Sequence, residues 1–183
     1  MGKFKVHTSA SAPEESRMVL EAVQKNMGMI PNLIGIMAEN PATVKAYTTL
    51  SEIFANAGFN GIEQQVIALT VSRGNDCQYC VAAHSMMAEM NKLDSVSLAN
   101  LRKGLPLSDR KLETLRKFTQ IIVDKKGLIS DQDLDQFLSQ GDYSTPHVLG
   151  LLIGVAMKTL SNYVNHIAKT PLDEPFKKYE WSK

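Results

Sequence analysis

Two cysteines and a histidine stand at a spacing that suits thiol chemistry. Cys77 and Cys80 are the only cysteines of the chain, and His84 follows four residues after the second one. On a helix that begins at Cys77, all three side chains share one face. Unpaired N–H groups at a helix start stabilise a thiolate, and a neighbouring histidine can accept or return a proton. Two thiols at this spacing can also close a disulfide, so the pattern predicts a peroxide-reducing or disulfide-exchange cycle.

A metal site and an inert buried pair are the two other interpretations of the cysteines. A structural zinc site usually draws on a second cysteine pair, which the chain lacks, so His84 and a distant His147 or His166 would have to complete it. Reduced cysteines also serve as small apolar core residues. Asp76, directly before the motif, would compete for the same N–H groups and oppose thiolate formation. We expect neither a metal ion nor a cofactor.

Helix start and stop signals recur along the whole chain and would position this motif. Pro, Ser and Asp introduce segments with apolar residues at helical spacing, and no segment alternates as a strand does. The motif is predicted to open a helix over 77–93, directly after a helix over 62–73. The other predicted helices begin near Pro13, Pro31, Pro41, Asp94, Ser108, Ser130 and Ser144. The chain is therefore expected to be all-α, with about seven to nine helices.

Length and composition indicate one compact domain. With 183 residues, of which 44% are hydrophobic and 21% charged, the chain is long and apolar enough for one core. We expect a single-domain helical bundle over 11–170, flanked by tails over 1–10 and 171–183. The apolar stripes are numerous for one domain of this size, which predicts a homo-oligomer.

Charge and hydropathy argue against several classes of partner. A formal net charge of +1 provides no strong field for nucleic acid or an anionic membrane surface. The longest apolar run, Val148 to Met157, is far shorter than the about 20 residues that span a bilayer. No apolar segment follows the first eight residues as it does in a secretory signal. We therefore expect a cytoplasmic protein without nucleic-acid or membrane partners, whose thiols are kept reduced.

The motif and its surroundings resemble a known family. The pattern Cys77-x-x-Cys80-x-x-x-His84, preceded by the apolar helix Gln65 to Arg73, is similar to the carboxymuconolactone decarboxylase family and specifically to its alkylhydroperoxidase D-like branch. Further similar segments are Pro31-Asn32, Leu107-Ser-Asp, Leu160 to His166 and Pro171-Leu-Asp, so that the resemblance covers most of residues 20–175. It implies an all-α domain that assembles as a trimer or hexamer. It also implies a thiol pair that reduces peroxides, with electrons from a dithiol or a lipoylated protein.

The resemblance also assigns roles to single residues. It makes Cys80 the peroxidatic thiol, Cys77 the resolving thiol and His84 a member of a proton relay, although helix-end electrostatics alone would make Cys77 the more acidic thiol. The family relay begins with a Glu twelve residues before the first Cys, where this chain has Gln65. An amide cannot exchange protons as a carboxylate does. Glu63 is two residues away on a different side of the same helix, so either another carboxylate substitutes or the relay is reduced to His84 and water. Restoring the carboxylate by Gln65→Glu is expected to raise turnover.

A polar pair lies on the late apolar helix. Asn162 and His166 are one turn apart and share a face that could border the thiols. A hydrogen-bonded core pair is the other interpretation. We count His166 among the residues that could line the site.

The sequence thus predicts an enzyme, a thiol-dependent peroxidase that acts on a peroxide through a disulfide cycle. A cofactor-free decarboxylase of the muconolactone type is the second hypothesis, although its chemistry does not need two adjacent thiols. The third hypothesis is a non-enzymatic oligomer whose disulfide senses redox state.

Overall fold

The computed structural model describes residues 3–183, and this part of the chain contains helices and no strand. Its elements are α1 (Glu14–Met27), α2 (Asn32–Met37), α3 (Pro41–Ala55), α4 (Gly61–Gly74), α5 (Gln78–Met90), α6 (Ser95–Lys103), α7 (Arg110–Asp124), α8 (Asp131–Gln140), α9 (Thr145–Ala168) and the 3₁₀ helix η1 (Glu174–Tyr179). The all-α prediction is confirmed.

Most helices begin and end at the residues whose chemistry marks a helix terminus. Gly28 ends α1 in the left-handed conformation with φ 74°, and the Asp94 side chain accepts from the Ser97 N–H at the start of α6. Two boundaries differ from the prediction. The cap of α7 is Asp109 rather than Ser108, since its carboxylate accepts from the N–H three residues on. The thiol helix ends at Met90 rather than at residue 93.

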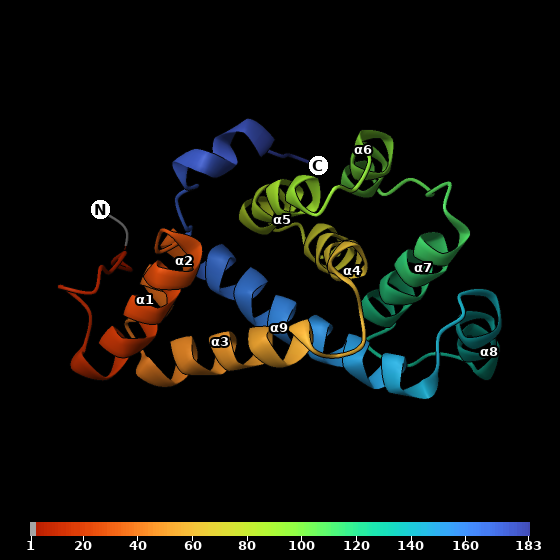
Figure 1. Ribbon diagram of the computed structural model, residues 1–183, viewed down its shortest axis with the longest axis horizontal. Helices are drawn as coiled ribbons and strands as arrows, with labels where there is room; N and C mark the ends of the chain where they lie inside the picture. Colours follow the sequence, from red (N-terminus) through yellow and green to blue (C-terminus); the bar gives the residue numbers. More distant parts are fainter. Residues whose placement is uncertain (1–2) are drawn as a thin grey trace.

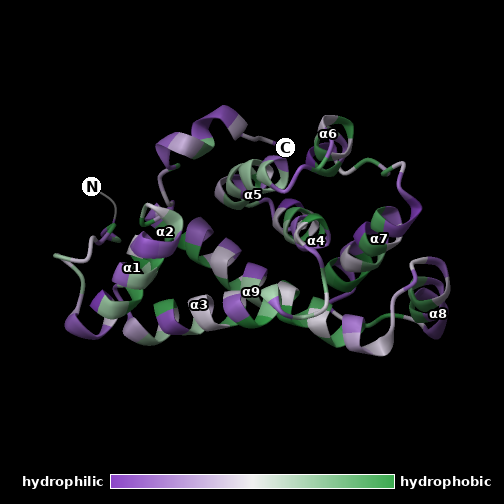
Figure 2. Cartoon of the chain, in the orientation of Figure 1, coloured by the Kyte–Doolittle hydropathy of each residue, from purple (hydrophilic) through white to green (hydrophobic). Residues whose placement is uncertain are grey.

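Helix α4 lies at the centre of the molecule and packs against α5, α7 and α9. Helix α9 runs along α3 beneath α4 and α5, so that residues far apart in sequence meet between these helices (Figure 1). Hydrophobic and hydrophilic residues lie on different sides of α7, as its role as an outer helix requires (Figure 2).

The buried apolar residues form two clusters. The first fills the space between α4, α7, α8 and α9 and contains a stack of rings in which the centroids of Phe118 and Phe137 are 4.1 Å apart. The second lies among α1, α2, α3 and α5 and includes both cysteines. The thiol pair is therefore part of the interior of the protein rather than of its surface.

The described parts of the two predicted tails, residues 3–10 and 171–183, pack on the helical domain, and residues 1–2 lie outside the described part of the chain. The N–H of His7 donates to the carbonyl of Gly35 at 3.1 Å, and a Cβ at Gly35 would lie only 2.7 Å from the His7 carbonyl oxygen. At the other end, the indole N–H of Trp181 donates to the Arg102 carbonyl at 3.0 Å. Phe176 in η1 is buried in the cluster that holds the cysteines. The C-terminal segment therefore belongs to the wall around the thiols.

Among the described residues, α9 is the helix whose length and composition would suit a membrane crossing. A central helix of a bundle passes the same test, and 39% of the most apolar window of α9 is buried inside the protein. The helix also carries a buried lysine and two buried asparagines, which face the cysteine pair and its surroundings.

Candidate functional site

The connection between α4 and α5 determines where the cysteines lie. Asp76 takes the left-handed conformation at φ 54°, and the Cys77 N–H then donates to the Ser72 carbonyl at 2.9 Å. Cys77 is the N-cap of α5 and Cys80 lies in its first turn. The Asp76 carboxylate is exposed and pairs with Lys183 at 2.8 Å. It therefore does not cap the thiol helix, contrary to the expectation from sequence.

One amide from α9 reaches both sulfurs. Each cysteine is free and only 1% exposed. The Nδ2 of Asn165 lies 3.1 Å from the Sγ of Cys80 and 3.6 Å from the Sγ of Cys77. The Oγ of Ser161, one turn earlier on α9, lies 3.8 Å from the Cys80 sulfur. The thiol pair is thus held between the start of α5 and one face of α9.

The two thiols differ in their tendency to ionise. The hydrogen bond with Cys80 and burial raise the pKa of Cys77, which keeps it a neutral thiol. Burial alone would raise the pKa of Cys80, but the hydrogen bond with Cys77 and the positive charge of Lys158 hold it well below the usual thiol value. The tertiary surroundings therefore favour Cys80 as the thiolate, the reverse of what helix-end electrostatics alone predicts.

His84 lies between an amide and an ammonium group. Its Nδ1 donates to the Oε1 of Gln65 at 2.8 Å, and its Nε2 accepts from the Nζ of Lys158 at 2.7 Å. Burial and the charge of Lys158 hold the pKa of His84 well below its usual value, so the ring is neutral. The structure thus brings Cys77, Cys80, His84 and Gln65 together as predicted, and adds a lysine that the sequence analysis did not assign to the site.

Lys158 is 1% exposed in the middle of α9. Burial would lower the pKa of Lys158, but the neighbouring Cys80 and Tyr47 raise it above the usual lysine value, so the side chain is an ammonium. The available sequence signal was a lone lysine at the end of a ten-residue apolar run, in a helix where polar residues recur at 158, 161, 162 and 165. This spacing marks one helical face, yet it does not tell which partner that face meets.

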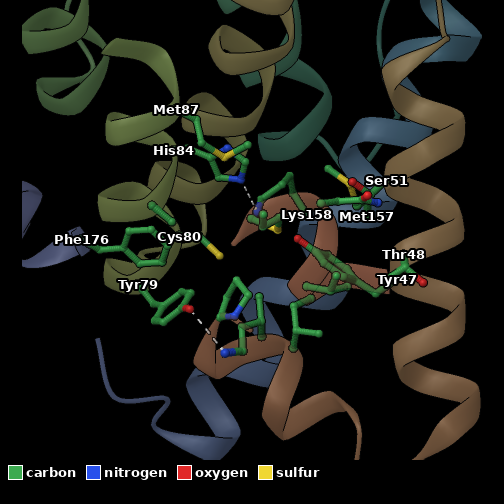
Figure 3. A pocket seen from close by; sticks show the side chains of 17 residues that line it. Tyr47, Thr48, Ser51, Tyr79, Cys80, His84, Met87, Met157, Lys158 and Phe176 are labelled. Atoms are coloured by element: carbon green, nitrogen blue, oxygen red, sulfur yellow. Dashed lines mark hydrogen bonds between the residues drawn. The ribbon is translucent and has the colours of Figure 1, made fainter. Parts of the chain in front are cut away.

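A cavity of about 250 Å³ opens onto Cys80. His84, Lys158, Tyr47 and Phe176 form part of its wall. Cys77 does not line the cavity. Figure 3 shows the Cys80 sulfur and the Tyr47 hydroxyl pointing into the same space beside Lys158. Its remaining lining is mostly apolar and includes Val23, Met27, Leu33, Ile34, Met87 and Met157. A ligand in this cavity would meet the Cys80 sulfur first.

Two predicted site residues lie elsewhere. Glu63 completes the capping box of α4 with Asn60, and its carboxylate also accepts from the Tyr143 hydroxyl at 3.0 Å. It is therefore committed to the N-terminal end of α4 and does not contact His84. His166 is exposed, whereas Asn165 points into the interior. Consecutive side chains on a helix point about 100° apart, so the two residues cannot share the buried face. The structure therefore does not bring Glu63 or His166 next to the thiol pair.

Asn162 belongs to the buried polar face of α9. Its Nδ2 lies 3.3 Å from the Ser72 hydroxyl, and its Oδ1 accepts from Asn75 at 3.0 Å. Within residues 3–183, no group of three His, Cys, Asp or Glu side chains is arranged to hold a metal ion.

The sequence comparison identifies a family pattern in the part of the chain that contains this site. The profile of the Carboxymuconolactone decarboxylase family matches residues 41–102, which include both cysteines, His84 and Gln65. No protein of curated function matches the chain significantly by sequence.

Solved structures of similar fold cover nearly the whole chain. An uncharacterized peroxidase-related protein from Ralstonia eutropha JMP134, described as an alkylhydroperoxidase core, has a TM-score of 0.82 and 16% identity, with 96% of this chain and 94% of that chain covered. An uncharacterized peroxidase-related protein from Silicibacter sp. TM1040 has a TM-score of 0.78 and 20% identity, with 96% and 97% covered. The debrominase Bmp8 has a TM-score of 0.74 and 15% identity, with 90% and 89% covered. The resemblance inferred from the motif is thereby confirmed: residues 41–102 carry the pattern of the carboxymuconolactone decarboxylase family, on an all-helical fold shared with the alkylhydroperoxidase-like proteins.

Proposed function

We propose that the protein is a thiol-dependent peroxidase in which Cys80 attacks a peroxide and Cys77 resolves the product as a disulfide. The observation that carries this proposal is the asymmetry of the pair. Only Cys80 borders the cavity, and only Cys80 has its pKa lowered, by the hydrogen bond with Cys77 and by Lys158 against the effect of burial. Cys77 lies behind it as a neutral thiol, within the reach of the same Asn165 amide.

The oxidative half of the cycle balances with these two thiols alone. The Cys80 thiolate attacks one peroxide oxygen, so an S–O bond forms, the O–O bond breaks, and its electron pair leaves with the second oxygen, which takes up a proton. Cys80 is then a sulfenic acid. The Cys77 thiol attacks its sulfur, and the disulfide forms as water leaves. Peroxide is reduced by two electrons and the dithiol is oxidised by two.

The return to the dithiol calls for an external reductant that fits the site. Because both cysteines are only 1% exposed, a protein thiol on another surface cannot reach them. A small dithiol or a narrow lipoyl-type arm can enter the cavity of about 250 Å³. We therefore propose a dihydrolipoyl-type donor.

The test is peroxide consumption with dihydrolipoamide as reductant, by the wild type and by two single-thiol variants. Cys80→Ser is expected to abolish turnover, because no attacking thiolate remains. Before dihydrolipoamide is added, Cys77→Ser is expected to consume one equivalent and stop as a sulfenic acid, which mass spectrometry identifies. If Cys77→Ser instead blocked the first oxidation and Cys80→Ser did not, the two roles would have to be exchanged. If the wild type turned over no peroxide with any dithiol, the proposal would be wrong.

Thiol counting separates the three hypotheses raised by the sequence. A peroxidase or a redox-sensing oligomer loses both free thiols after one equivalent of peroxide, whereas a cofactor-free decarboxylase has no reason to. Repeated turnover with a dithiol distinguishes the peroxidase from the sensor.

A brominated aromatic compound is a second substrate class, favoured by the mostly apolar cavity. A cavity of about 150 Å³ is enough for benzene, so this one accommodates a substituted ring. The fold is similar to that of Bmp8, of which a variant was solved with 2,3,4-tribromopyrrole. In the corresponding reaction the Cys80 thiolate takes the bromine, the carbon keeps the electron pair and gains a proton, and Cys77 displaces bromide to form the disulfide. Release of bromide in the presence of dihydrolipoamide, measured by ion chromatography, tests this alternative.

A further inference from the structure

Lys158 is a buried cation whose charge must be balanced inside the protein. A charged side chain that is 1% exposed is strongly unfavourable unless another group compensates for the lost water. Its Nζ donates to the Nε2 of His84 at 2.7 Å, but a neutral imidazole supplies a hydrogen-bond acceptor and no negative charge. The compensating anion has to come from another side chain near the cavity.

The titratable groups that act on Lys158 come from two helices. Helix α5 contributes Cys77, Cys80 and His84, and α3 contributes Tyr47. Burial raises the pKa of Tyr47, so the phenol stays protonated. The hydrogen bond with Cys80 and burial likewise keep Cys77 protonated. Cys80, which borders the same cavity as Lys158, is therefore the group of this set that can provide the negative charge.

His84 has no free position with which to accept the thiol proton. Its Nδ1–H is donated to Gln65, whose Oε1 can only accept, and its Nε2 lone pair is occupied by Lys158. Protonation of Nε2 would break the bond to Lys158 and place two cations side by side. Gln65 occupies the position at which the expected relay has an acidic residue. Because its amide is neutral, it keeps the His84 ring neutral, and the Nε2 of that ring remains an acceptor for the Lys158 ammonium group.

We infer that Lys158, rather than His84, is the counter-ion of the Cys80 thiolate and the proton donor to the leaving oxygen, and that His84 and Gln65 are positioning residues for its ammonium group. This inference rests on the proposed function, since it assigns the proton of the peroxide step. The geometry that carries it is the chain of contacts Gln65–His84–Lys158, which ends at the cavity beside Cys80.

The assignment keeps the buried charges balanced through the whole cycle. In the reduced state the thiolate of Cys80 and the ammonium of Lys158 form a neutral pair. When the O–O bond breaks, the leaving oxygen takes a proton from Lys158, and the amine is neutral while Cys80 is an uncharged sulfenic acid. The disulfide then forms with loss of water and no change in charge. Reduction by a dithiol returns one proton to Cys77 and one to Lys158, and regenerates the Cys80 thiolate.

The test measures the ionisation of Cys80 without any peroxide. In a Cys77→Ser background, the rate at which iodoacetamide alkylates Cys80 is followed from pH 5 to 10 by mass spectrometry. Lys158→Met removes the charge at similar side-chain length. It is expected to shift the midpoint of the profile upward by at least about one pH unit, which is about tenfold in thiolate content at neutral pH. His84→Gln is expected to shift the midpoint less, because the ammonium remains.

Three further variants make the outcome decisive. Lys158→Arg keeps the positive charge and is expected to retain a low midpoint. Lys158→Gln replaces Lys158→Met if circular dichroism shows that the Met variant is unfolded, and it is judged by the same criterion. Lys111→Met removes an exposed lysine that pairs with Glu63 at 3.1 Å, and it is expected to leave the profile unchanged. A shift in His84→Gln that equals or exceeds the shift in the neutral Lys158 variant would overturn the inference.

The inference and the proposed function fail in different ways. A Cys80 midpoint that depends on Lys158 supports Lys158 as the counter-ion of the thiolate even if the wild type reduces no peroxide, in which case the proposed function and the proton-donor role fail together. Conversely, peroxide turnover that persists at the wild-type rate in Lys158→Met would overturn the inference and leave the thiol cycle intact.

Discussion

The side-chain amide of Asn165 on α9 contacts both sulfurs of the motif on α5, at 3.1 Å from Cys80 and 3.6 Å from Cys77. Its Oδ1 is buried and has no hydrogen-bond partner among the described residues. The amide therefore has one group that stabilises a thiolate and one acceptor that remains open. A sulfenic acid formed on Cys80 carries an O–H group. This group can donate a hydrogen bond to the open Oδ1 of Asn165.

Asn165→Ala is accordingly expected to weaken the thiolate of Cys80. A hydrogen bond to a charged group contributes about 1.5–3 kcal/mol, which corresponds to a rise of about one to two units in the pKa of Cys80. The measurement is the pH profile of alkylation in the Cys77→Ser background. His166→Ala, on the same helix but exposed, is the matched control and should leave the profile in place. An unchanged profile in Asn165→Ala would show that the amide does not support the thiolate.

Gln65→Glu is expected to lower peroxide turnover, not to raise it as the sequence alone suggested. A carboxylate at this position would accept from the Nδ1–H of His84 and favour a protonated ring, which would then repel Lys158 and lose its acceptor at Nε2. Loss of an acid–base group typically costs about 10²–10⁴-fold, and we expect a decrease near the lower end because the lysine remains present. Steady-state turnover from pH 6 to 9 measures it.

The combination with Lys158→Met makes this prediction sharper. In the double variant Gln65→Glu/Lys158→Met, the carboxylate still favours a protonated His84 ring. That ring no longer faces the positive charge of Lys158, so His84 can act as the proton carrier. The double variant should therefore turn over faster than Lys158→Met alone. Additive losses in the double-mutant cycle would contradict a coupling between the two positions.

Asp173→Asn is expected to loosen the C-terminal wall of the cavity. The Asp173 carboxylate accepts from the Tyr79 hydroxyl and from the N–H of Asn32 at 3.1 Å, and Phe176 follows three residues later in η1. Weakening a charge-assisted bond of this kind costs about 1–3 kcal/mol. A bulky maleimide should then react with Cys80 faster relative to iodoacetamide than in the wild type. Glu174→Gln, an exposed carboxylate beside it, is the control, and an equal ratio in both variants would contradict this role for Asp173.

The outer face of α9 is expected to lie in an oligomer interface. Leu149, Leu152, Tyr163 and Ile167 are exposed and recur at spacings of three, four and eleven residues, which puts them along one side of the helix. Light scattering of the wild type should report a mass above the 20.2 kDa of one chain, and Leu152→Glu should reduce it. Leu128→Glu alters a more exposed leucine outside α9 and serves as control. A monomeric wild type at micromolar concentration would rule the interface out.

The sequence by itself determined the helices and the local geometry of the motif. Caps such as Gly28 and Asp94 end or begin helices through contacts within a few residues, and these depend little on the rest of the fold. The spacing of Cys77, Cys80 and His84 likewise places them together, because all three lie within the first two turns of one helix. Gln65 could be paired with His84 because the family resemblance marks its position.

Only the tertiary structure decided which thiol ionises and what balances its charge. The start of α5 favours Cys77 locally, but Lys158 and Asn165 approach from a helix about 80 residues later in the chain and favour Cys80 instead. Periodicity identifies the buried face of α9 only to within about one residue, and one residue separates the exposed His166 from the buried Asn165. The sequence likewise could not predict that Phe176 lines the cavity. A short polar tail carries no periodic pattern that identifies the residues it packs against.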